Sequence, residues 1–193
     1  LGVLTAGSLR RVTGSLDQQT DVDVFQITAP ARIEVDLSFI GTSTAADLDV
    51  LLIDPVALSA VERFDSSGNS ESGTFVLKGT AFLVVQSFAG ASDYALELTG
   101  RSLGATVAEV EPNGTVALGR YLGAFTNGDS VTLAGSVDTG DSDFFLMAMP
   151  AASLTQFSCN FSANNDLDLY FYDATGSLNP GSAFQESIST SIP

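Results

Sequence analysis

The chain of 193 residues contains no histidine, no tryptophan and a single cysteine. Without histidine, neither a Ser–His–Asp nor a Cys–His catalytic group can form, and His-ligated zinc is excluded as well. Cys159 alone can make neither an intramolecular disulfide nor a cysteine-rich metal site. The sequence also lacks a glycine-rich phosphate-binding loop of the Walker or dinucleotide type. These absences predict a protein that is not an enzyme.

Basic residues are scarce. Lys and Arg together number 7, with Lys78 the single lysine, against 23 Asp and Glu, which gives a net charge of −16. Such a charge repels phosphate backbones and anionic membranes, so nucleic acid and membrane surfaces are poor partners. Cations, or surfaces that carry them, are better candidates. The alternative is that the acidic excess only keeps an exported protein soluble.

Long apolar runs are missing too. The longest, such as residues 81–85, fall far short of the roughly 18 residues that cross a bilayer, so no membrane insertion is expected. The chain starts at Leu1 without Met, basic region or apolar signal stretch, so we expect a processed product or an excised piece of something longer. Abundant Ser, Thr, Gly and Ala with almost no lysine favour an extracellular or cell-surface location.

The two halves of the chain share one pattern. Residues 1–17 align without gaps on residues 122–138 at an offset of 121, with seven identities that include Gly14 with Gly135. Short slips then align further acidic residues: Asp21 and Asp23 with Asp141 and Asp143, Asp47 and Asp49 with Asp166 and Asp168, and Glu71 with Glu186. We therefore predict two repeats, 1–100 and 108–193, joined by a linker at 101–107. The first lacks a counterpart of the segment that opens the second, and the second lacks the last two strands of the first.

Each aligned segment has the pattern of a strand. Residues 32–39 alternate polar and apolar side chains, a period of two typical of a half-buried antiparallel strand with Ile33, Val35, Leu37 and Phe39 inward. The aligned residues 155–161 place Phe157, Cys159 and Phe161 inward, so Cys159 is expected to be a small core residue. Further strands are expected at 47–53, 75–77, 81–86 and 94–98. With no sustained 3.6-residue pattern, the chain is predicted to be all-β, a sandwich or barrel.

The order of these motifs resembles a known family, the bacterial pre-peptidase C-terminal domain, which is related to the collagen-binding domains of clostridial collagenases. In the second repeat the matching residues are Glu109-Val-Glu111-Pro-Asn113, Gly135-Ser136, Asp141-Ser-Asp143-Phe-Phe145, Asp166-Leu-Asp168 and Glu186. In the first they are Gly14-Ser15, Asp21-Val-Asp23, Asp47-Leu-Asp49, Glu71 and Asp93-Tyr-Ala-Leu. The first repeat departs from the family by lacking a Glu-x-Glu-x-Asn segment, and no peptidase domain is present.

The resemblance implies two tandem jelly-roll-like antiparallel β-sandwich domains, the second incomplete at its C-terminus. It also implies a calcium site, because the Glu-x-Glu-x-Asn segment in the family lies beside the Asp-x-Asp loop. An extended backbone points alternate side chains the same way, and Ca²⁺ takes six to eight oxygen ligands. The implied metal ligands are Glu109, Glu111, Asn113, Asp141 and Asp143, with Asp138 as a further candidate. Alternatively, 109–113 is a solvated linker and the aspartates cap turns.

In the first repeat the resemblance leaves only a half-site, at Asp17, Asp21 and Asp23. Tyr170 and Tyr172 share a strand face with Asp166 and Asp168, which is either a polymer-binding surface or an ordinary outer face. A carboxylate pair can catalyse glycoside hydrolysis, but the recurrence of Asp pairs at strand ends in both repeats indicates structure instead.

Two functions are consistent with these features. The first is an extracellular, non-catalytic accessory module, calcium-stabilised, that binds an insoluble polymer or a cell-surface component. The second is a structural subunit of an extracellular filament, in which copies of the chain complete one another head to tail by donor-strand exchange.

Overall fold

The structure is a computed structural model that describes residues 1–56, 58–104, 106–126, 128–149, 155–157, 168–173, 177, 184–185 and 190–192. It divides into two compact units, Leu1–Met149 and Pro150–Pro193. In this described part every regular element is a strand except one 3₁₀ turn, η1 (Val116–Leu118), so the all-β prediction is confirmed. None of the described residues forms a helix with the length and apolar character that crossing a membrane requires.

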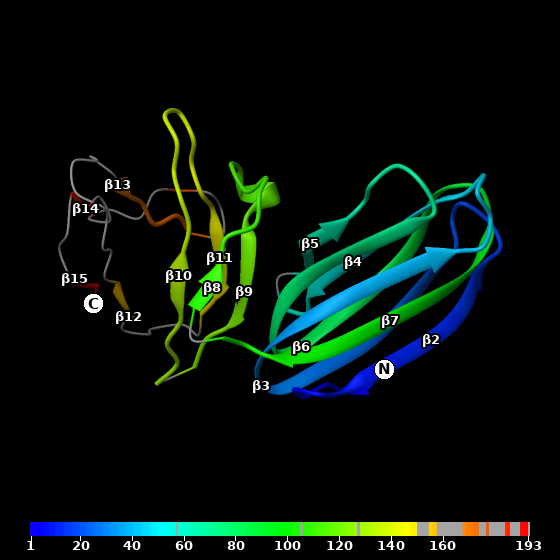
Figure 1. Ribbon diagram of the computed structural model, residues 1–193, viewed down its shortest axis with the longest axis horizontal. Coiled ribbons are helices and arrows are strands. Elements are labelled where there is room, and N and C mark those ends of the chain that lie inside the picture. The colour runs from blue at the N-terminus through cyan, green and yellow to red at the C-terminus, as the bar shows by residue number, and fades with distance from the viewer. Residues whose placement is uncertain are drawn as a thin grey trace. The chain divides into compact units, whose positions relative to one another are not determined.

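Seven strands form the first sheet: β1 (Gly2–Val3), β2 (Leu9–Leu16), β3 (Val22–Gly41), β4 (Asp47–Asp54), β5 (Ser59–Phe64), β6 (Ser70–Ala89) and β7 (Ser92–Ser102). The order is β2-β7-β3-β6-β4-β5 (Figure 1). β1 pairs with β3 in parallel. The predicted strands at 75–77 and 81–86 are parts of β6, which passes through Gly79 at a φ of +82°.

The sheet bends into a sandwich because β3 and β6 each take part in two layers. Their register shifts between Ala29 and Ile33. The part of β3 before the shift pairs with the part of β6 that also pairs with β4. The part after the shift pairs with the beginning of β6 and with β7. We call this seven-stranded structure the sandwich.

The alternation predicted for residues 32–39 is confirmed. Ile33, Val35, Leu37 and Phe39 are all buried, and they pack in one core with residues from the other strands. Phe39 is 0% exposed, and its ring lies 5.3 Å from that of Tyr94, centroid to centroid. The inward placement expected for Cys159 lies outside the described residues.

Replacing Phe39 with Ala should lower the free energy of unfolding by about 3–5 kcal/mol, because a fully buried ring leaves a cavity behind. Its neighbour Ile40 is 57% exposed on the opposite face, so Ile40→Ala is the matched control and should change stability by about 0.5 kcal/mol or less. Urea denaturation followed by circular dichroism measures both. Equal losses would contradict the assigned strand facing.

Residues 103–149 form two short strand pairs. β8 (Thr106–Ala108) pairs with β10 (Thr132–Ala134), and β9 (Arg120–Ala124) pairs with β11 (Phe145–Ala148), both in parallel. The expected linker at 101–107 therefore contains the end of β7 and the start of β8. In the unit Pro150–Pro193, β12 (Thr155–Phe157) pairs with β15 (Thr190–Ile192) and β13 (Asp168–Leu169) with β14 (Phe184–Gln185). The division into two sequence repeats stays a prediction.

β9 is fastened to the sandwich by buried polar contacts. The backbone N–H of Tyr121 donates to the Glu62 carboxylate at 2.9 Å, and the Tyr121 hydroxyl donates to Asp54 at 3.3 Å. The guanidinium of Arg120, 5% exposed, donates to the carbonyl and the hydroxyl of Thr74 at 2.6 and 3.1 Å. Burying these groups leaves them dependent on one another, because an unpaired buried polar group is costly.

Burial beneath β9 makes Glu62 sensitive to pH. Burial raises the pKa of Glu62 to about 7, against a lowering by the Tyr121 N–H and by the charge of Arg120. The folded state thus binds the proton more tightly than the unfolded state, and this group's contribution to stability falls as pH rises from about 4.5 to 7.

Glu62→Gln should therefore remove part of the loss of stability seen between pH 5 and 8 in the parent protein. Denaturant melts at several pH values measure that slope. Glu97→Gln takes a carboxylate from an exposed ion pair with Arg11 and serves as the charge-matched control. If both variants keep the parent slope, Glu62 is not protonated in the folded state near neutral pH.

Candidate metal site

The site begins where β8 ends beside β10. Ala108 lies opposite Ala134, and the N–H of Glu109 donates to the Ala134 carbonyl at 2.9 Å. The next position of β10's path is Gly135, followed by Ser136, whose N–H donates to the Glu109 carboxylate at 2.6 Å. Strand pairing therefore fixes the backbone of Glu109 and one of its carboxylate oxygens.

Gly135 makes room for that carboxylate. A Cβ atom at position 135 would lie 2.0 Å from the Oε2 atom of Glu109, closer than any real contact of this kind. Any residue with a side chain at this position would displace the Glu109 carboxylate. The sequence singled out Gly135 as the match of Gly14 and as part of the Gly135-Ser136 motif, and its role at the site was not predicted.

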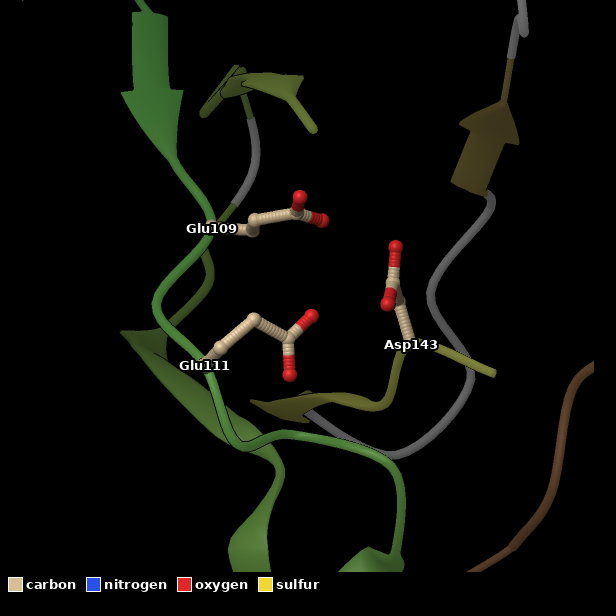
Figure 2. A group of neighbouring side chains, drawn as sticks. All are labelled: Glu109, Glu111 and Asp143. Carbon is tan, nitrogen blue, oxygen red and sulfur yellow. The ribbon is translucent and has the colours of Figure 1, made fainter. Parts of the chain in front are cut away.

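Three carboxylates converge here (Figure 2). Glu109 and Glu111 extend from one segment toward Asp143 on the facing segment, and one ligand atom of each lies within 4.8 Å of the others. The Oε2 atom of Glu109 and the Oδ1 atom of Asp143 are buried and have no hydrogen-bond partner among the described residues. The structure thus brings together three of the five predicted ligands.

Asn113, a fourth predicted ligand, is fully buried beside them. Its N–H donates to the Glu111 carboxylate at 3.0 Å, and its carbonyl accepts from the N–H of Phe144 at 3.1 Å. Both polar atoms of its side-chain amide are buried without a partner in the described structure. Asn113 therefore links the Glu109–Glu111 arm to the segment that carries Asp143 and holds an unsatisfied amide there.

Asp141 and Asp138 lie outside the cluster of three. The N–H of Asp141 donates to the Asp138 carbonyl at 3.0 Å, and its carboxylate accepts from the N–H of Ser142 at 2.8 Å. These bonds shape the turn that leads into Asp143, which is the turn-capping role left open by the sequence. Asp141 still acts on the site through its negative charge.

The aspartates of the first repeat are used differently. The Asp21 carboxylate accepts from the N–H of Asp17 at 3.1 Å, and the Asp23 carboxylate accepts from the hydroxyl of Tyr94 at 2.5 Å. The predicted half-site therefore holds internal hydrogen bonds. The partnership of Asp23 with Tyr94 was not predicted, because the two residues are 71 positions apart.

The pKa of Asp143 reflects its burial and the like charges around it. Burial raises the pKa of Asp143 to about 7, and contact with Glu109 and the negative charges of Glu109, Asp141 and Glu111 act in the same direction. Carboxylate and amide oxygens are the ligands that hard cations such as Ca²⁺ prefer. The unpartnered buried oxygens and the uncompensated charge fit such an ion.

Glu109→Gln should lower the pKa of Asp143 from about 7, because it removes the nearest negative charge. A ¹³C NMR titration of the aspartate side chains in cation-free buffer measures the shift. Asp138→Asn, at an exposed turn position, should leave the Asp143 titration unchanged. A parent Asp143 that titrates near 4 would contradict the cluster geometry.

No family model matches the chain, and no curated protein matches it. Among the solved structures that match, three resemble about half of it. The pre-peptidase C-terminal domain of collagenase from Bacillus anthracis has 20% identity and a TM-score of 0.43, covering 51% of this chain and 91% of that one. The periplasmic g-type lysozyme inhibitor PliG of Aeromonas hydrophila has 16% identity, coverage of 52% and 95%, and a TM-score of 0.41.

The third is the mitogen derived from Yersinia pseudotuberculosis, with 12% identity, coverage of 48% and 86%, and a TM-score of 0.39. The first of the three carries the name of the family that the motif order resembles. The likeness concerns the fold, and membership of that family stays a prediction.

Proposed function

We propose that the protein is an extracellular, non-catalytic accessory module that binds a structural Ca²⁺ ion through Glu109, Glu111 and Asp143. The observation that carries the proposal is the convergence of these three carboxylates, because Glu109 and Asp143 each place a buried oxygen there that has no partner in the described structure. The buried amide of Asn113 offers a fourth oxygen from the protein. Solvent supplies the remaining ligands that Ca²⁺ requires.

The ligand chemistry favours calcium over softer metals. All candidate ligands are oxygens, whereas zinc and copper sites usually include imidazole or thiolate. The chain has no histidine, and its one cysteine is at position 159. Glu109, Glu111 and Asp143 bring negative charges close together, and these charges repel one another. A divalent cation would cancel most of that charge.

Ca²⁺ at this position would connect the arm at 109–113 to the rest of the unit. Asp143 and Phe144 precede β11, which pairs with β9. The N–H of Arg120 at the start of β9 donates to the Phe144 carbonyl at 2.8 Å. β9 in turn is fastened to the sandwich through Tyr121 and Glu62. The ion would thus stabilise a continuous set of contacts from the arm to the sandwich core.

The module's target, in this proposal, is an insoluble polymer or a cell-surface component. Tyr170 and Tyr172 are 45% and 48% exposed, and the Tyr170 hydroxyl donates to Asp168 at 3.1 Å. Exposed aromatic rings next to a carboxylate suit a polymer that offers both apolar and hydrogen-bonding groups. The strong negative charge of the chain favours a target that carries cations.

Ca²⁺ should raise the melting temperature of the parent protein, since an ion that binds only the folded state at 100 times its Kd adds about 2.7 kcal/mol. Asp143→Asn should abolish this response. In chelator at pH 8 the same variant should melt above the parent, because the ionised Asp143 is repelled by Glu109 and Glu111.

The two melting curves therefore cross: the variant is more stable without Ca²⁺ and less stable with it. Differential scanning calorimetry with and without Ca²⁺ measures both, and isothermal titration gives the affinity. Glu97→Gln removes one negative charge from the exposed ion pair with Arg11, outside the cluster, and should respond to Ca²⁺ like the parent. An Asp143→Asn variant that melts below the parent under both conditions would show a role in folding alone.

A further inference from the structure

Gly14 and Gly135, which the sequence alignment pairs, do the same thing in the structure. β2 pairs with β7 so that Gly14 lies opposite Tyr94, and a Cβ at position 14 would lie 2.4 Å from the Tyr94 hydroxyl oxygen. At position 135 it would lie 2.0 Å from the Glu109 carboxylate. Each glycine thus leaves a slot beside its strand that a side chain of the neighbouring strand fills.

The side chain in each slot reaches the aligned aspartate. Tyr94 donates its hydroxyl to Asp23 at 2.5 Å, and Glu109 approaches Asp143, the residue aligned with Asp23. Glu109 follows Ala108, which lies opposite Ala134, so it faces Gly135 as Tyr94 faces Gly14. The strand directions differ, however: β7 is antiparallel to β2, whereas β8 is parallel to β10.

The two side chains that occupy the slots, Tyr94 and Glu109, differ in charge. A phenol is a neutral donor and satisfies the carboxylate of Asp23, whereas the carboxylate of Glu109 adds a second negative charge beside Asp143. When both carboxylates are ionised and no cation lies between them, repulsion opposes the contact of Glu109 with Asp143. The contact of Tyr94 with Asp23 meets no such repulsion. A strand that brought a tyrosine to Gly135 would relieve Asp143 as Tyr94 relieves Asp23.

β8 also pairs with its neighbouring strand over fewer residues than β7 does. β8 pairs with β10 at three positions, whereas β7 pairs with β2 at eight. Val137 is 37% exposed, although Leu16, at the aligned position of β2, is 1% exposed. A longer strand at this edge would gain backbone hydrogen bonds and cover apolar surface that β8 leaves exposed.

We infer that the edge of β10 beside Gly135 is a binding site for an antiparallel strand that carries tyrosine opposite Gly135 and apolar residues at alternate positions. This strand and residues 106–111 exclude each other, because both occupy the space over Gly135. The inference rests on the proposed function for its regulation: Ca²⁺ holds Glu109 on Asp143 and closes the slot, and removal of Ca²⁺ opens it. Binding of such a strand is thereby made calcium-dependent.

The probe is a fluorescently labelled peptide of residues 92–102, which contains the strand that fills the equivalent slot. With the full chain in chelator, the peptide should bind, and Ca²⁺ should weaken binding by at least about tenfold, since the two states compete for one position. Hydrogen exchange should rise at residues 106–109 and fall at 132–137 when the peptide binds. A peptide with phenylalanine in place of Tyr94 should bind more weakly, because it lacks the donor for Asp143.

Gly135→Ala should abolish peptide binding, because the added methyl group occupies the slot. Gly114→Ala is the matched control, because its Cβ would meet only the Ser142 carbonyl at an ordinary distance of 3.5 Å. Failure of the peptide to bind the parent in chelator, or equal binding to Gly135→Ala, overturns the inference.

Ca²⁺ affinity measured by calorimetry on the same samples separates this inference from the proposed function. If Ca²⁺ binds while peptide affinity is the same with and without it, competition for the slot is refuted and the calcium site stands. If Ca²⁺ does not bind, the proposed function and the regulation fail together, and peptide binding in the parent against Gly135→Ala decides whether the slot accepts a strand.

Discussion

Repulsion among Glu109, Glu111 and Asp143 is the constraint on which the segment 103–149 depends. The ligand atoms of these three carboxylates lie within 4.8 Å of one another, so their negative charges repel. Three outcomes relieve them: a proton on Asp143, a cation among them, or departure of the arm that carries the two glutamates. Each has a structural consequence, because Glu109 is held by the backbone of Ala134 and Ser136 and cannot move without breaking those bonds.

That consequence extends to the sandwich through β9. The N–H of Phe144, the residue after Asp143, donates to the Asn113 carbonyl of the arm. The Phe144 carbonyl in turn accepts from the N–H of Arg120. Arg120 and Tyr121 are 5% and 6% exposed, so they belong to the packed interior of the unit Leu1–Met149. Leu122 adds a second, smaller core with Val76 and Val107. Charge balance at the site and packing at the sandwich are therefore joined by a few short contacts.

Much of this could be predicted from the sequence. The period of two over residues 32–39 gave the strand and its buried face, because a half-buried strand shows its orientation in every residue. The spacing of Glu109, Glu111 and Asn113 against Asp143 gave most of the candidate site through a family resemblance. Asp141 was assigned as a ligand on the same ground, although its backbone and carboxylate bonds form a turn in the structure.

What the sequence did not reveal are contacts between residues far apart in the chain. The pair Tyr121 and Glu62 is separated by 59 positions, and neither residue stands in a distinctive motif. Their partnership depends on how β9 packs on the sandwich, which local patterns do not encode. The role of Gly135 is similar, because a glycine that makes room for a distant carboxylate looks like a turn residue until both strands are placed.

The comparison of Gly14 with Gly135 shows how one backbone feature can give either a permanent or a conditional contact. Over Gly14, a phenol donates to Asp23, and no ion is needed to keep that contact. Over Gly135, a carboxylate faces a carboxylate, so the contact is favourable only when a proton or cation lies between them. A glycine makes room in both places, and the side chain that occupies the room decides whether the contact depends on a proton or cation. Gly14 and Gly135 thus leave similar room, and the charge of the side chain that occupies it distinguishes the two contacts.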